Sequence, residues 1–503
     1  MQTGKHLMRE QISLAVNGKL VNVDTADVRL TLSDWLRQRK RLSGTKVVCA
    51  EGDCGACSVL CADALAGEPF TYRAIDSCIR FMYQLDGTHV ITVEGLSIGD
   101  GLYPVQQAMV KHFGSQCGFC TPGFVNTLTA VAQSYAPTKN QLEECVVKRE
   151  LTGNLCRCTG YQQIIEAACS IDLQALPSLA ELYDENSIVQ SLQVCRDSAS
   201  VDEEEHTTYL PVGLQEAIEL RKTKPDAVLV AGATDLGVQH NIQKLAAGNR
   251  ILLTRVSELQ DVSITDTEII IGAAVNWHDV RSAIAQDFPC FDELLDLFGS
   301  PQIRNVGTLG GNLMNASPIA DSIPFLMVTD AVLEAAGPDG TRSVSIEEFY
   351  TGYKQTVLDE NEILVRVRIP RVHRDDDIEL LKVSQRRDMD ISTVTCALRI
   401  KLKNNVIEEA RMAFGGVGPI VHRLPQTESL LCNEPLTLEL FEQAGVMAVT
   451  EVKPVSDVRG SNTYRLQLVK NALSCCAHRI FAKRNGVTLP STSTAVSTVR
   501  LQH

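Results

Sequence analysis

Eight of the chain's 17 cysteines fall into two groups whose spacing is typical of metal-cluster ligands. The first group has the pattern C-x4-C-x2-C followed by a distant fourth member: Cys49, Cys54, Cys57 and Cys78. This is the plant-type arrangement for a 2Fe-2S cluster. Gly52 and Gly55 would let the backbone wrap closely and aim N–H groups at the cluster sulfurs. Four structural thiols or a zinc site is the weaker interpretation, because zinc sites favour paired C-x2-C knuckles.

The second group consists of two close pairs, Cys117 with Cys120 in QCGFCTPG and Cys156 with Cys158 in NLCRCTGY. Both pairs lie at junctions of predicted helical segments, so a two-by-two site between helix ends is geometrically reasonable. By spacing alone, zinc and a 2Fe-2S cluster both remain open, although a C-x-C pair is less usual for structural zinc. Within the first 170 residues, three further cysteines are left out of both groups: Cys61, Cys145 and Cys169. Of these, we expect Cys145 and Cys169 to be core thiols.

Two glycine-containing loops in the second half of the chain could hold a nucleotide. Residues 229–237, LVAGATDLG, follow an apolar strand and can present consecutive backbone N–H groups to a pyrophosphate. Residues 305–321, NVGTLGGNLMNASPIAD, form a second loop of the same kind. A single glycine most often marks a turn, but the two loops together are more specific. No G-x-G-x-x-G occurs, so a Rossmann site is not supported.

The elements that would position the cysteines change in type along the first 170 residues. Residues 12–24 predict two strands around an Asn17-Gly18 turn. A helix follows within residues 31–40, with Thr31 or Ser33 as its N-cap. After the first cysteine loop, four helical segments are predicted at residues 104–114, 122–136, 141–151 and 160–169. The second cysteine group therefore belongs to a small helical bundle.

The rest of the chain reads as α+β with less regular ends. Residues 171–207 include the acidic run 202–205 and predict a linker. Beyond it, β-like runs at 227–232, 250–256, 268–275, 363–369 and 392–402 alternate with helical stretches at 213–223 and 276–286. The residues after about 485 are rich in Ser and Thr and predict a frayed tail.

Composition limits the classes of protein this chain can represent. A length of 503 residues predicts several domains, and 44% hydrophobic with 21% charged residues is a globular balance. The net charge of -14 argues against nucleic-acid binding, which needs a basic face. Residues 1–11 lack a signal-peptide core and no later stretch reaches the roughly 18 apolar residues of a membrane span. We therefore expect a cytoplasmic protein whose many cysteines serve metal or redox chemistry.

These motifs resemble a known family. QCGFCTPG and TGNLCRCTGYQQI resemble the second 2Fe-2S domain of the xanthine dehydrogenase and aldehyde oxidase family, which are molybdenum hydroxylases, and the two glycine loops resemble that family's FAD-binding segments. The resemblance covers about residues 10–485. It implies a multidomain α+β fold: a plant-type ferredoxin β-grasp at 10–97, a helical 2Fe-2S bundle at 98–170, a linker at 171–207, a two-part FAD-binding domain of the vanillyl-alcohol-oxidase (PCMH) type at 208–380, an α+β C-terminal cap at 381–485 and a tail at 486–503.

The resemblance also implies which residues contact cofactors. Both cysteine groups would hold 2Fe-2S clusters, and Gln116 would approach the pterin of the molybdenum cofactor. No catalytic residue is expected in this chain. Residues 384–392, SQRRDMDIS, would lie where a nicotinamide docks beside the flavin. The implied FAD contacts are Leu229, Val230, Ala231, Gly232, Ala233, Thr234, Asp235, Leu236, Phe298, Gly307, Thr308, Gly311, Asn312, Met314, Asn315, Asp321, Leu364 and Lys382.

The implied activity is electron transfer between a substrate-oxidising partner and NAD. Electrons would come from a molybdopterin-binding large subunit, pass through the helical and the ferredoxin-like clusters to FAD, and reach NAD during oxidation of hypoxanthine or xanthine to urate. A heterotetramer of two small and two large subunits is expected. The corresponding subunit of an aldehyde, nicotinate or carbon-monoxide dehydrogenase is the first alternative. The second is a zinc-stabilised interaction module on an unrelated flavoprotein.

Cofactor content tests the cysteine assignment. Two complete ligand sets predict two 2Fe-2S clusters, together with one FAD per chain. EPR of the reduced protein should show two distinct cluster signals. Replacing Cys158 with Ser should remove one signal and leave the other, because Cys158 belongs to only one set. Loss of both signals, or of neither, would contradict the assignment.

Overall fold

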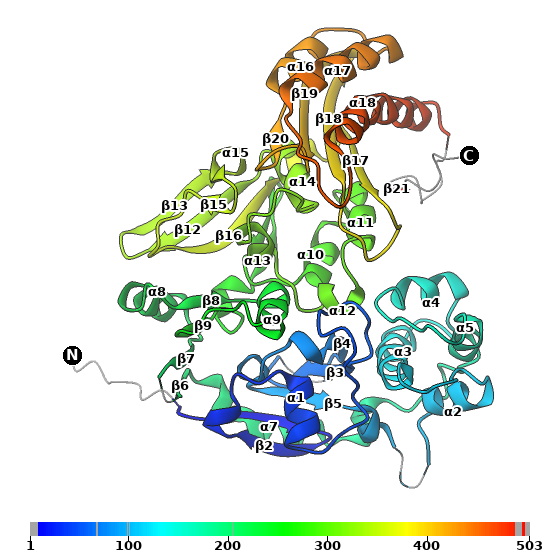
Figure 1. Cartoon of the computed structure of the whole chain (residues 1–503), viewed down its shortest axis with the longest axis vertical. Helices are drawn as coiled ribbons and strands as arrows, with labels where there is room; N and C mark the ends of the chain where they lie inside the picture. The colour runs from blue at the N-terminus through cyan, green and yellow to red at the C-terminus, as the bar shows by residue number, and fades with distance from the viewer. Residues whose placement is uncertain are drawn as a thin grey trace. The chain divides into compact units, whose positions relative to one another are not determined.

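The computed structural model describes residues 9–66, 69–97, 99, 101–203, 205–487 and 495–497. The chain divides into two compact units (Figure 1). Unit 1 comprises Met1–Ser257 together with the segment Ser300–Gly307, and unit 2 comprises Glu258–Gly299 and Thr308–His503. The short segment 300–307 thus belongs with the first half of the chain, although unit 2 surrounds it in sequence.

Unit 1 begins with a five-stranded sheet in the order β2-β1-β5-β3-β4. Its strands are β1 (Ile12–Val16), β2 (Lys19–Val23), β3 (Ser58–Asp63), β4 (Arg73–Asp76) and β5 (Thr88–Ile91). The predicted hairpin is confirmed: β1 pairs antiparallel with β2, and Asn17 and Gly18 both have positive φ. Helix α1 (Leu32–Gln38) packs Leu32, Trp35 and Leu36 against the sheet core. Thr31 is its N-cap and accepts a hydrogen bond from the Asp34 N–H.

The predicted helical bundle is present. Its helices are α2 (Pro104–Lys111), α3 (Thr121–Tyr135), α4 (Glu144–Glu150) and α5 (Gln162–Cys169). Phe124 and Leu128 of α3 share a core with Leu60 and Ile91 of the sheet. The prediction of Cys145 as a core thiol is wrong, because its position on α4 faces solvent. Cys169 is half-buried against the bundle core.

The segment 171–207, for which the sequence predicted a linker, folds onto unit 1. It contains α6 (Leu179–Leu182), α7 (Glu185–Leu192) and β6 (Ala199–Asp202). Ile188, Leu192 and Cys195 are buried in the same core as the helical bundle. These three residues stand at helical spacing, but the linker prediction rested on the irregular segment as a whole and on the acidic run 202–205. Within the acidic run, Glu204 lies outside the described residues.

Unit 1 ends in a four-stranded sheet in the order β6-β7-β9-β8. β7 (Thr207–Leu210), β8 (Val228–Val230) and β9 (Arg250–Leu252) run parallel, and helices α8 (Leu214–Thr223) and α9 (Thr234–Asn241) connect them. The glycine loop at 229–237 is therefore a strand-to-helix turn between β8 and α9. α12 (Pro301–Arg304) also belongs to this unit.

Unit 2 contains two five-stranded sheets and helices, as predicted for an α+β region. The first sheet has the order β10-β11-β16-β12-β13 and the second has the order β20-β19-β18-β17-β21. The elements of the first part are β10 (Val262–Ile264), β11 (Glu268–Gly272), α10 (Trp277–Ile284), α11 (Pro289–Asp296), α13 (Leu309–Met314), α14 (Ser322–Val328), β12 (Val332–Gly337), β13 (Gly340–Ser345), α15 (Ile346–Phe349), β14 (Tyr350–Gly352), β15 (Gln355–Thr356) and β16 (Ile363–Pro370).

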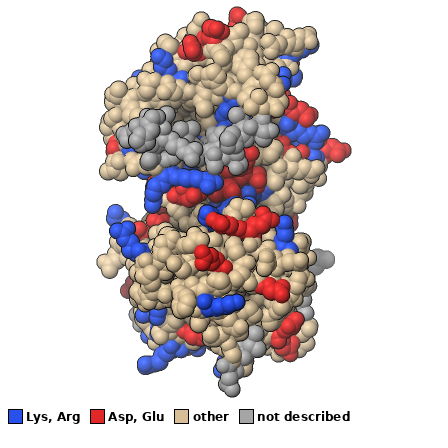
Figure 2. Space-filling view, turned by 90° about the vertical axis from the view of Figure 1, so that its right-hand side faces the viewer, with Lys and Arg blue, Asp and Glu red and all other residues tan. Residues whose placement is uncertain are grey.

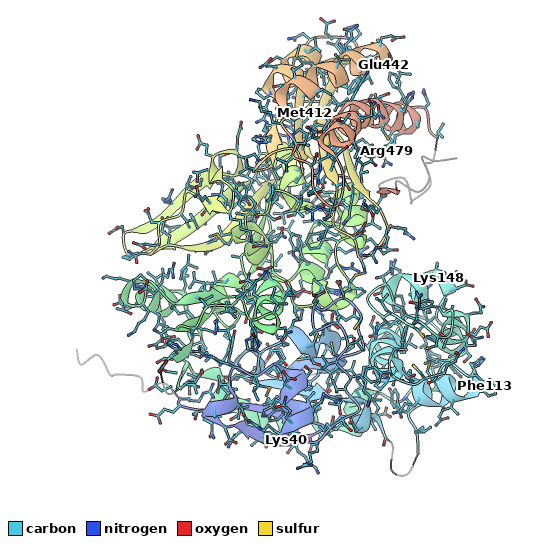
Figure 3. The ribbon with its side chains drawn as sticks, in the orientation of Figure 1. Lys40, Phe113, Lys148, Met412, Glu442 and Arg479 are labelled. Carbon is cyan, nitrogen blue, oxygen red and sulfur yellow. The ribbon has the colours of Figure 1, made fainter. Side chains whose placement is uncertain are left out.

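The second sheet of unit 2 is covered by three helices. The elements are β17 (Asp377–Ser384), β18 (Val394–Lys403), β19 (Val406–Gly415), β20 (His422–Arg423), α16 (Pro425–Leu431), α17 (Leu438–Glu451), α18 (Asn462–Arg484) and β21 (Ala495–Ser497). Met412 of β19 is fully buried in this core, and Arg479 of α18 forms an ion pair with Glu379 of β17 (Figure 3). β21 lies inside the predicted tail and pairs in parallel with β17, whereas 488–494 and 498–503 are outside the described residues.

Acidic and basic side chains are interspersed on the face shown in Figure 2, in keeping with the net charge of -14. Among the described residues, no helix has the length and apolar character needed to cross a membrane.

Asp86 ties three separate segments of unit 1 together, and its removal should destabilise the unit. Its fully buried carboxylate forms ion pairs with Arg9 and Arg255 and accepts a hydrogen bond from the Ser13 N–H at 2.9 Å. Asp86→Ala would leave two guanidinium groups without this partner, which should lower the free energy of unfolding by about 3–5 kcal/mol. Denaturant-induced unfolding measures the loss. The exposed Asp24→Ala is the control, and equal effects of the two changes would contradict this role for Asp86.

Candidate functional site

The first cysteine group lies in the loop between α1 and β3 and in the turn after β4. Cys54, Cys57 and Cys78 are buried and Cys49 is half-buried. Gly55 has φ of +63°, and a Cβ added there would lie 2.3 Å from the carbonyl oxygen of Gly153. A side chain at this position would therefore force apart two loops that carry cysteines of different groups.

The four thiols of this first group interact with one another. Hydrogen bonds with the Cys54 and Cys78 side chains hold the pKa of Cys49 well below its usual value. The hydrogen bond to Cys49 raises the pKa of Cys54 and of Cys78, and the contact with Cys78 lowers the pKa of Cys57. Two of the thiols are thus biased toward the thiolate, which is the form that binds metal.

The first group fits a two-iron cluster by the chemistry of its donors. Among the described residues, no three or more His, Cys, Asp or Glu side chains surround one point where a single ion could bind. A 2Fe-2S cluster does not require such convergence, because its four thiolates are shared between two irons. Four thiols connected by side-chain contacts, three on the glycine-containing loop and one on the turn after β4, are therefore compatible with such a cluster.

The second cysteine group brings the start of α3 next to the loop before α5. Cys120 contacts Cys156, and Cys117 contacts Cys158. Burial and the hydrogen bond with Cys156 raise the pKa of Cys120 to about 12. Burial would also raise the pKa of Cys156, but hydrogen bonds from the Thr159 side chain and backbone outweigh it and lower this pKa. The two-by-two pairing expected from the sequence is thus present, and it also suits two irons. Gln116, expected near a pterin, is exposed beside Cys117.

The loops of the two groups are hydrogen-bonded to each other. The Leu155 N–H donates to the Cys54 carbonyl at 2.9 Å, and Asn154 Nδ2 donates to the Gly55 carbonyl at 3.2 Å. A Cβ at Gly123, on α3, would lie 2.0 Å from the same Gly55 oxygen. The residues next to Cys54 and next to Cys156 are therefore in direct backbone contact. Two redox groups held by these cysteines would be close neighbours.

The first predicted FAD loop, residues 229–236, lies in unit 1 beside the residues that begin the second. A Cβ at Gly232 would lie 2.2 Å from the Val306 carbonyl oxygen and 2.8 Å from the Gly307 Cα. Gln84 Nε2 donates to the Ala231 carbonyl at 2.9 Å and braces the loop. Ala233 is the left-handed N-cap of α9 and supplies no capping side chain. The first N–H groups of α9 are then available to an anion such as a diphosphate.

The predicted FAD residues in unit 2 lie around α13 and β17. Thr308 caps α13 by accepting from the Gly311 N–H at 3.1 Å, and Asn312 Oδ1 accepts from Ser322 at 2.6 Å. Phe298 packs against the Trp277 ring with centroids 4.8 Å apart. The other predicted contacts differ in exposure: Leu364 is buried, Met314 is 41% exposed and Asn315 accepts from Lys354 at 3.5 Å. None of these contacts excludes a ligand.

Asp321 and Lys382 have a structural role that the sequence did not reveal. Lys382 Nζ lies 2.8 Å from Asp321 Oδ2, and both side chains are nearly inaccessible. Ser392 and Thr395 donate to the other Asp321 oxygen at 2.5 and 2.8 Å. This buried carboxylate is thus already satisfied within unit 2. Contact of Asp321 and Lys382 with FAD stays a prediction.

The predicted nicotinamide segment, residues 384–392, is braced by its own hydrogen bonds. The Arg386 N–H donates to Asp390 at 2.8 Å, and the Arg386 guanidinium donates to the Met389 carbonyl at 2.6 Å. Met389 has a positive φ of 52°. Whether a nicotinamide docks on this loop stays a prediction.

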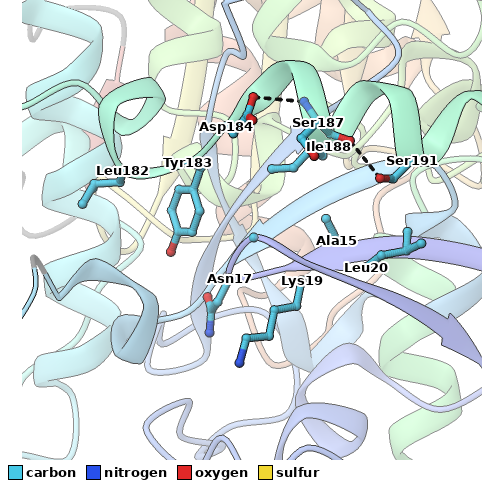
Figure 4. A pocket seen from close by; sticks show the side chains of 11 residues that line it. Ala15, Asn17, Lys19, Leu20, Leu182, Tyr183, Asp184, Ser187, Ile188 and Ser191 are labelled. Atoms are coloured by element: carbon cyan, nitrogen blue, oxygen red, sulfur yellow. Dashed lines mark hydrogen bonds between the residues drawn. The ribbon is translucent and has the colours of Figure 1, made fainter.

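A groove of about 370 Å³ lies elsewhere in unit 1 (Figure 4). The β1–β2 hairpin and the α6–α7 region line it, with Asn17, Lys19, Tyr183 and Asp184 among the lining residues. None of the residues predicted for cofactor binding lines this groove. It is therefore separate from the candidate site.

Sequence reasoning missed the buried residues that connect the cysteine loops. Gln302, on α12, contacts Asn154 at a separation of 148 residues along the chain. No spacing pattern in the sequence links Gln302 to Asn154. The sequence shows only that each residue lies beside a recognised motif.

Three family models match the chain. A [2Fe-2S] binding domain matches residues 92–169, an FAD binding domain in molybdopterin dehydrogenase matches 203–372, and a CO dehydrogenase flavoprotein C-terminal domain matches 379–480. The chain is 33% identical to a xanthine dehydrogenase of Drosophila subobscura over 90% of its own length and 38% of the relative's. It is 30% identical to xanthine dehydrogenase 1 of Arabidopsis thaliana, covering 89% of this chain and 38% of that protein. The chain therefore spans only 38% of these relatives.

Two solved structures resemble part of the chain. One is a carbon monoxide dehydrogenase from Hydrogenophaga pseudoflava, with 26% identity and a TM-score of 0.53, covering 55% of this chain and 96% of that one. The other is quinoline 2-oxidoreductase from Pseudomonas putida 86, with 26% identity and a TM-score of 0.51 over the same shares.

Gly232→Ala tests the first FAD loop. The added methyl would meet the backbone of Val306 and Gly307, neither of which can move aside alone, so the loops should separate and FAD affinity should fall by at least tenfold, about 1.4 kcal/mol. Iron content should not change. Gly213→Ala is the matched control, because a Cβ there meets nothing within 4 Å. Retention of FAD by the Gly232 variant would remove this loop from the FAD site.

Proposed function

We propose that this chain, which belongs to the molybdenum hydroxylase family and carries its [2Fe-2S]-binding and FAD-binding domains, relays electrons between a molybdenum site and NAD. The observation that carries the proposal is the backbone contact between the two cysteine groups. The 2.9 Å hydrogen bond between the Cys54 carbonyl and the Leu155 N–H joins Cys54 of the first group to the residue just before Cys156 of the second group. Electron exchange requires redox groups that are held close together, and this backbone contact keeps the two cysteine groups adjacent.

Each group of residues has a definite task in this proposal. The two cysteine groups hold one 2Fe-2S cluster each, on loops whose positions the backbone contacts fix. Residues 229–236 line the diphosphate of FAD in this proposal, and the rest of FAD is held by Gly307, Thr308, Gly311, Asn312 and Asp321. When bound, the clusters would supply single-electron transfer and FAD would supply exchange with a two-electron acceptor. The protein itself positions these groups.

The proposed fold names follow from the same set of observations. The sheet order β2-β1-β5-β3-β4 with α1 packed on it supports a ferredoxin-like β-grasp at 10–97. The helices α2–α5 support the helical cluster domain at 98–170. The parallel strands β7–β9 support the first part of a vanillyl-alcohol-oxidase type FAD domain, with the second sheet of unit 2 as its cap.

We propose xanthine or hypoxanthine as the substrate of the molybdenum site. Support comes from relatives called xanthine dehydrogenase, which match about nine-tenths of the chain, whereas the carbon monoxide and quinoline enzymes match 55%. Oxidation of the purine would take place on a molybdopterin-binding partner, because the residues assigned here bind redox groups only. Residues 384–392 would then present NAD to the flavin.

A second candidate is the corresponding unit of another molybdenum hydroxylase. The TM-scores of 0.53 and 0.51 to the carbon monoxide and quinoline enzymes favour it, since the FAD domain alone does not distinguish substrates. Substrate choice belongs to the molybdenum site, so only an assay of the complex separates the two candidates.

The complex purified with its partner should form NADH from xanthine, and not reduce NAD or a dye with carbon monoxide or quinoline. Cys156→Ser should abolish xanthine-dependent NADH formation, because it breaks the cluster site proposed to receive the electrons. The same variant should keep NADH-dependent dye reduction, since that reaction needs only the flavin side. Stopped-flow absorbance follows both reactions.

Two results would contradict the proposal. If Cys156→Ser lost NADH-dependent dye reduction together with the xanthine reaction, the proposed order of electron transfer would be wrong. Activity with carbon monoxide or quinoline and none with xanthine would favour the second candidate.

A further inference from the structure

A single buried amide connects the segments that carry both cysteine groups. Gln302 on α12 has no exposed surface, and the two N–H groups of its Nε2 are shared among three oxygens: Asn154 Oδ1 at 2.8 Å, Thr127 Oγ1 at 3.2 Å and Ser58 Oγ at 3.3 Å. Ser58 follows Cys57, Thr127 lies on the helix that Cys120 precedes, and Asn154 stands two residues before Cys156. One side chain from the later half of the sequence thus contacts both groups.

The carbonyl oxygen of the Gln302 amide carries a free-energy cost. Gln302 Oε1 has no hydrogen-bond partner among the described residues, and it lies so close to Gly153 that a Cβ there would be 2.1 Å away. An unmet buried acceptor costs about 1–3 kcal/mol. A methionine would fill similar space without that cost. The amide therefore provides something that packing alone does not, namely the directional contacts of its Nε2 with three oxygens.

The neighbours of Gln302 contact the same redox region. Ile303 packs against Cys57 and Cys78. Asn305 Nδ2 donates to the Ala74 carbonyl at 2.8 Å, on the strand that leads to Cys78. The Val306 carbonyl faces Gly232 of the first FAD loop. Within unit 1, the segment 300–307 therefore contacts both cysteine groups and residues 229–236.

We propose that Gln302 is a positioning residue for electron exchange between the two clusters, an inference that rests on the proposed function. The contacts of its Nε2 with the three oxygens fix the Ser58, α3 and Asn154 segments relative to one another. Without them, the cysteine loops are joined by the Leu155–Cys54, Asn154–Gly55 and Asn126–Ser58 hydrogen bonds and by packing, which leaves the separation of the clusters less defined. Because the rate of electron transfer falls steeply with distance, a less defined separation of the clusters slows the transfer. Buried polar networks of this kind select one arrangement among several well-packed ones.

The test compares Gln302→Met with Gln133→Met in the full protein with its partner. Gln133 is the matched control: its Nε2 donates to Tyr103 and to the Pro177 carbonyl, away from every cysteine of the two groups. Both variants should keep iron, FAD and two cluster EPR signals. In Gln302→Met, the low-temperature splitting caused by spin coupling between the reduced clusters should shrink or broaden. Electron redistribution between the clusters after pulse reduction should slow severalfold. Gln133→Met should match the unchanged protein.

A milder variant keeps the test decisive if Gln302→Met loses its clusters or does not fold. Thr127→Val removes one of the three acceptors at nearly constant shape and should change the splitting and the rate in the same direction, by less. Unchanged splitting and rate in Gln302→Met, or in Thr127→Val where that variant decides, would overturn the inference alone. Absence of two cluster signals from the unchanged protein would overturn the proposed function and this inference with it.

Discussion

The contact between the Cys54–Gly55 backbone and the loop around Asn154–Leu155 is the constraint on which unit 1 depends. The Gly55 carbonyl accepts from Asn154 and also lies against Gly123 of α3, so one peptide group contacts two parts of the helical bundle. Backbone atoms approach this closely only where side chains are absent. The glycines near both cysteine groups are therefore required by the contact between domains as much as by the wrapping of each loop around its own site.

This constraint explains why polar side chains are buried between the two groups. Closely packed loops leave carbonyl and hydroxyl groups without water, and each of these needs a partner inside the protein. Asn126 donates to the Ser58 carbonyl at 2.8 Å, Asn154 to that of Gly55, and Gln302 to three side-chain oxygens. The amides provide directional contacts where apolar packing would let the loops slide. Precision between the cysteine groups is thus obtained with groups that each cost something to bury.

Local features were predictable from the sequence because their causes are local. The Asn17-Gly18 turn and the Thr31 cap each depend on residues within three positions. Features set by distant contacts were not. The segment 171–207 folds because Ile188 and Leu192 reach a core built by other domains, and Gln302 meets its partners only in the folded unit. The spacing of cysteines also carries no information on burial, which is why Cys145 was wrongly predicted to be a core thiol.

The Asp321–Lys382 pair shows a limit of assigning a residue's role from a family resemblance. The resemblance implies that both residues contact FAD, yet in unit 2 they are each other's partners, with Ser392 and Thr395 completing the carboxylate. Removal of either charge alone would leave the other buried without compensation, which costs about 3–5 kcal/mol. Loss of flavin from such a variant would therefore report loss of the local fold as readily as loss of a cofactor contact. Asn312 is the better probe, because among the described residues its side chain makes one hydrogen bond, which it accepts from Ser322, and its amide N–H donors stay available to a ligand.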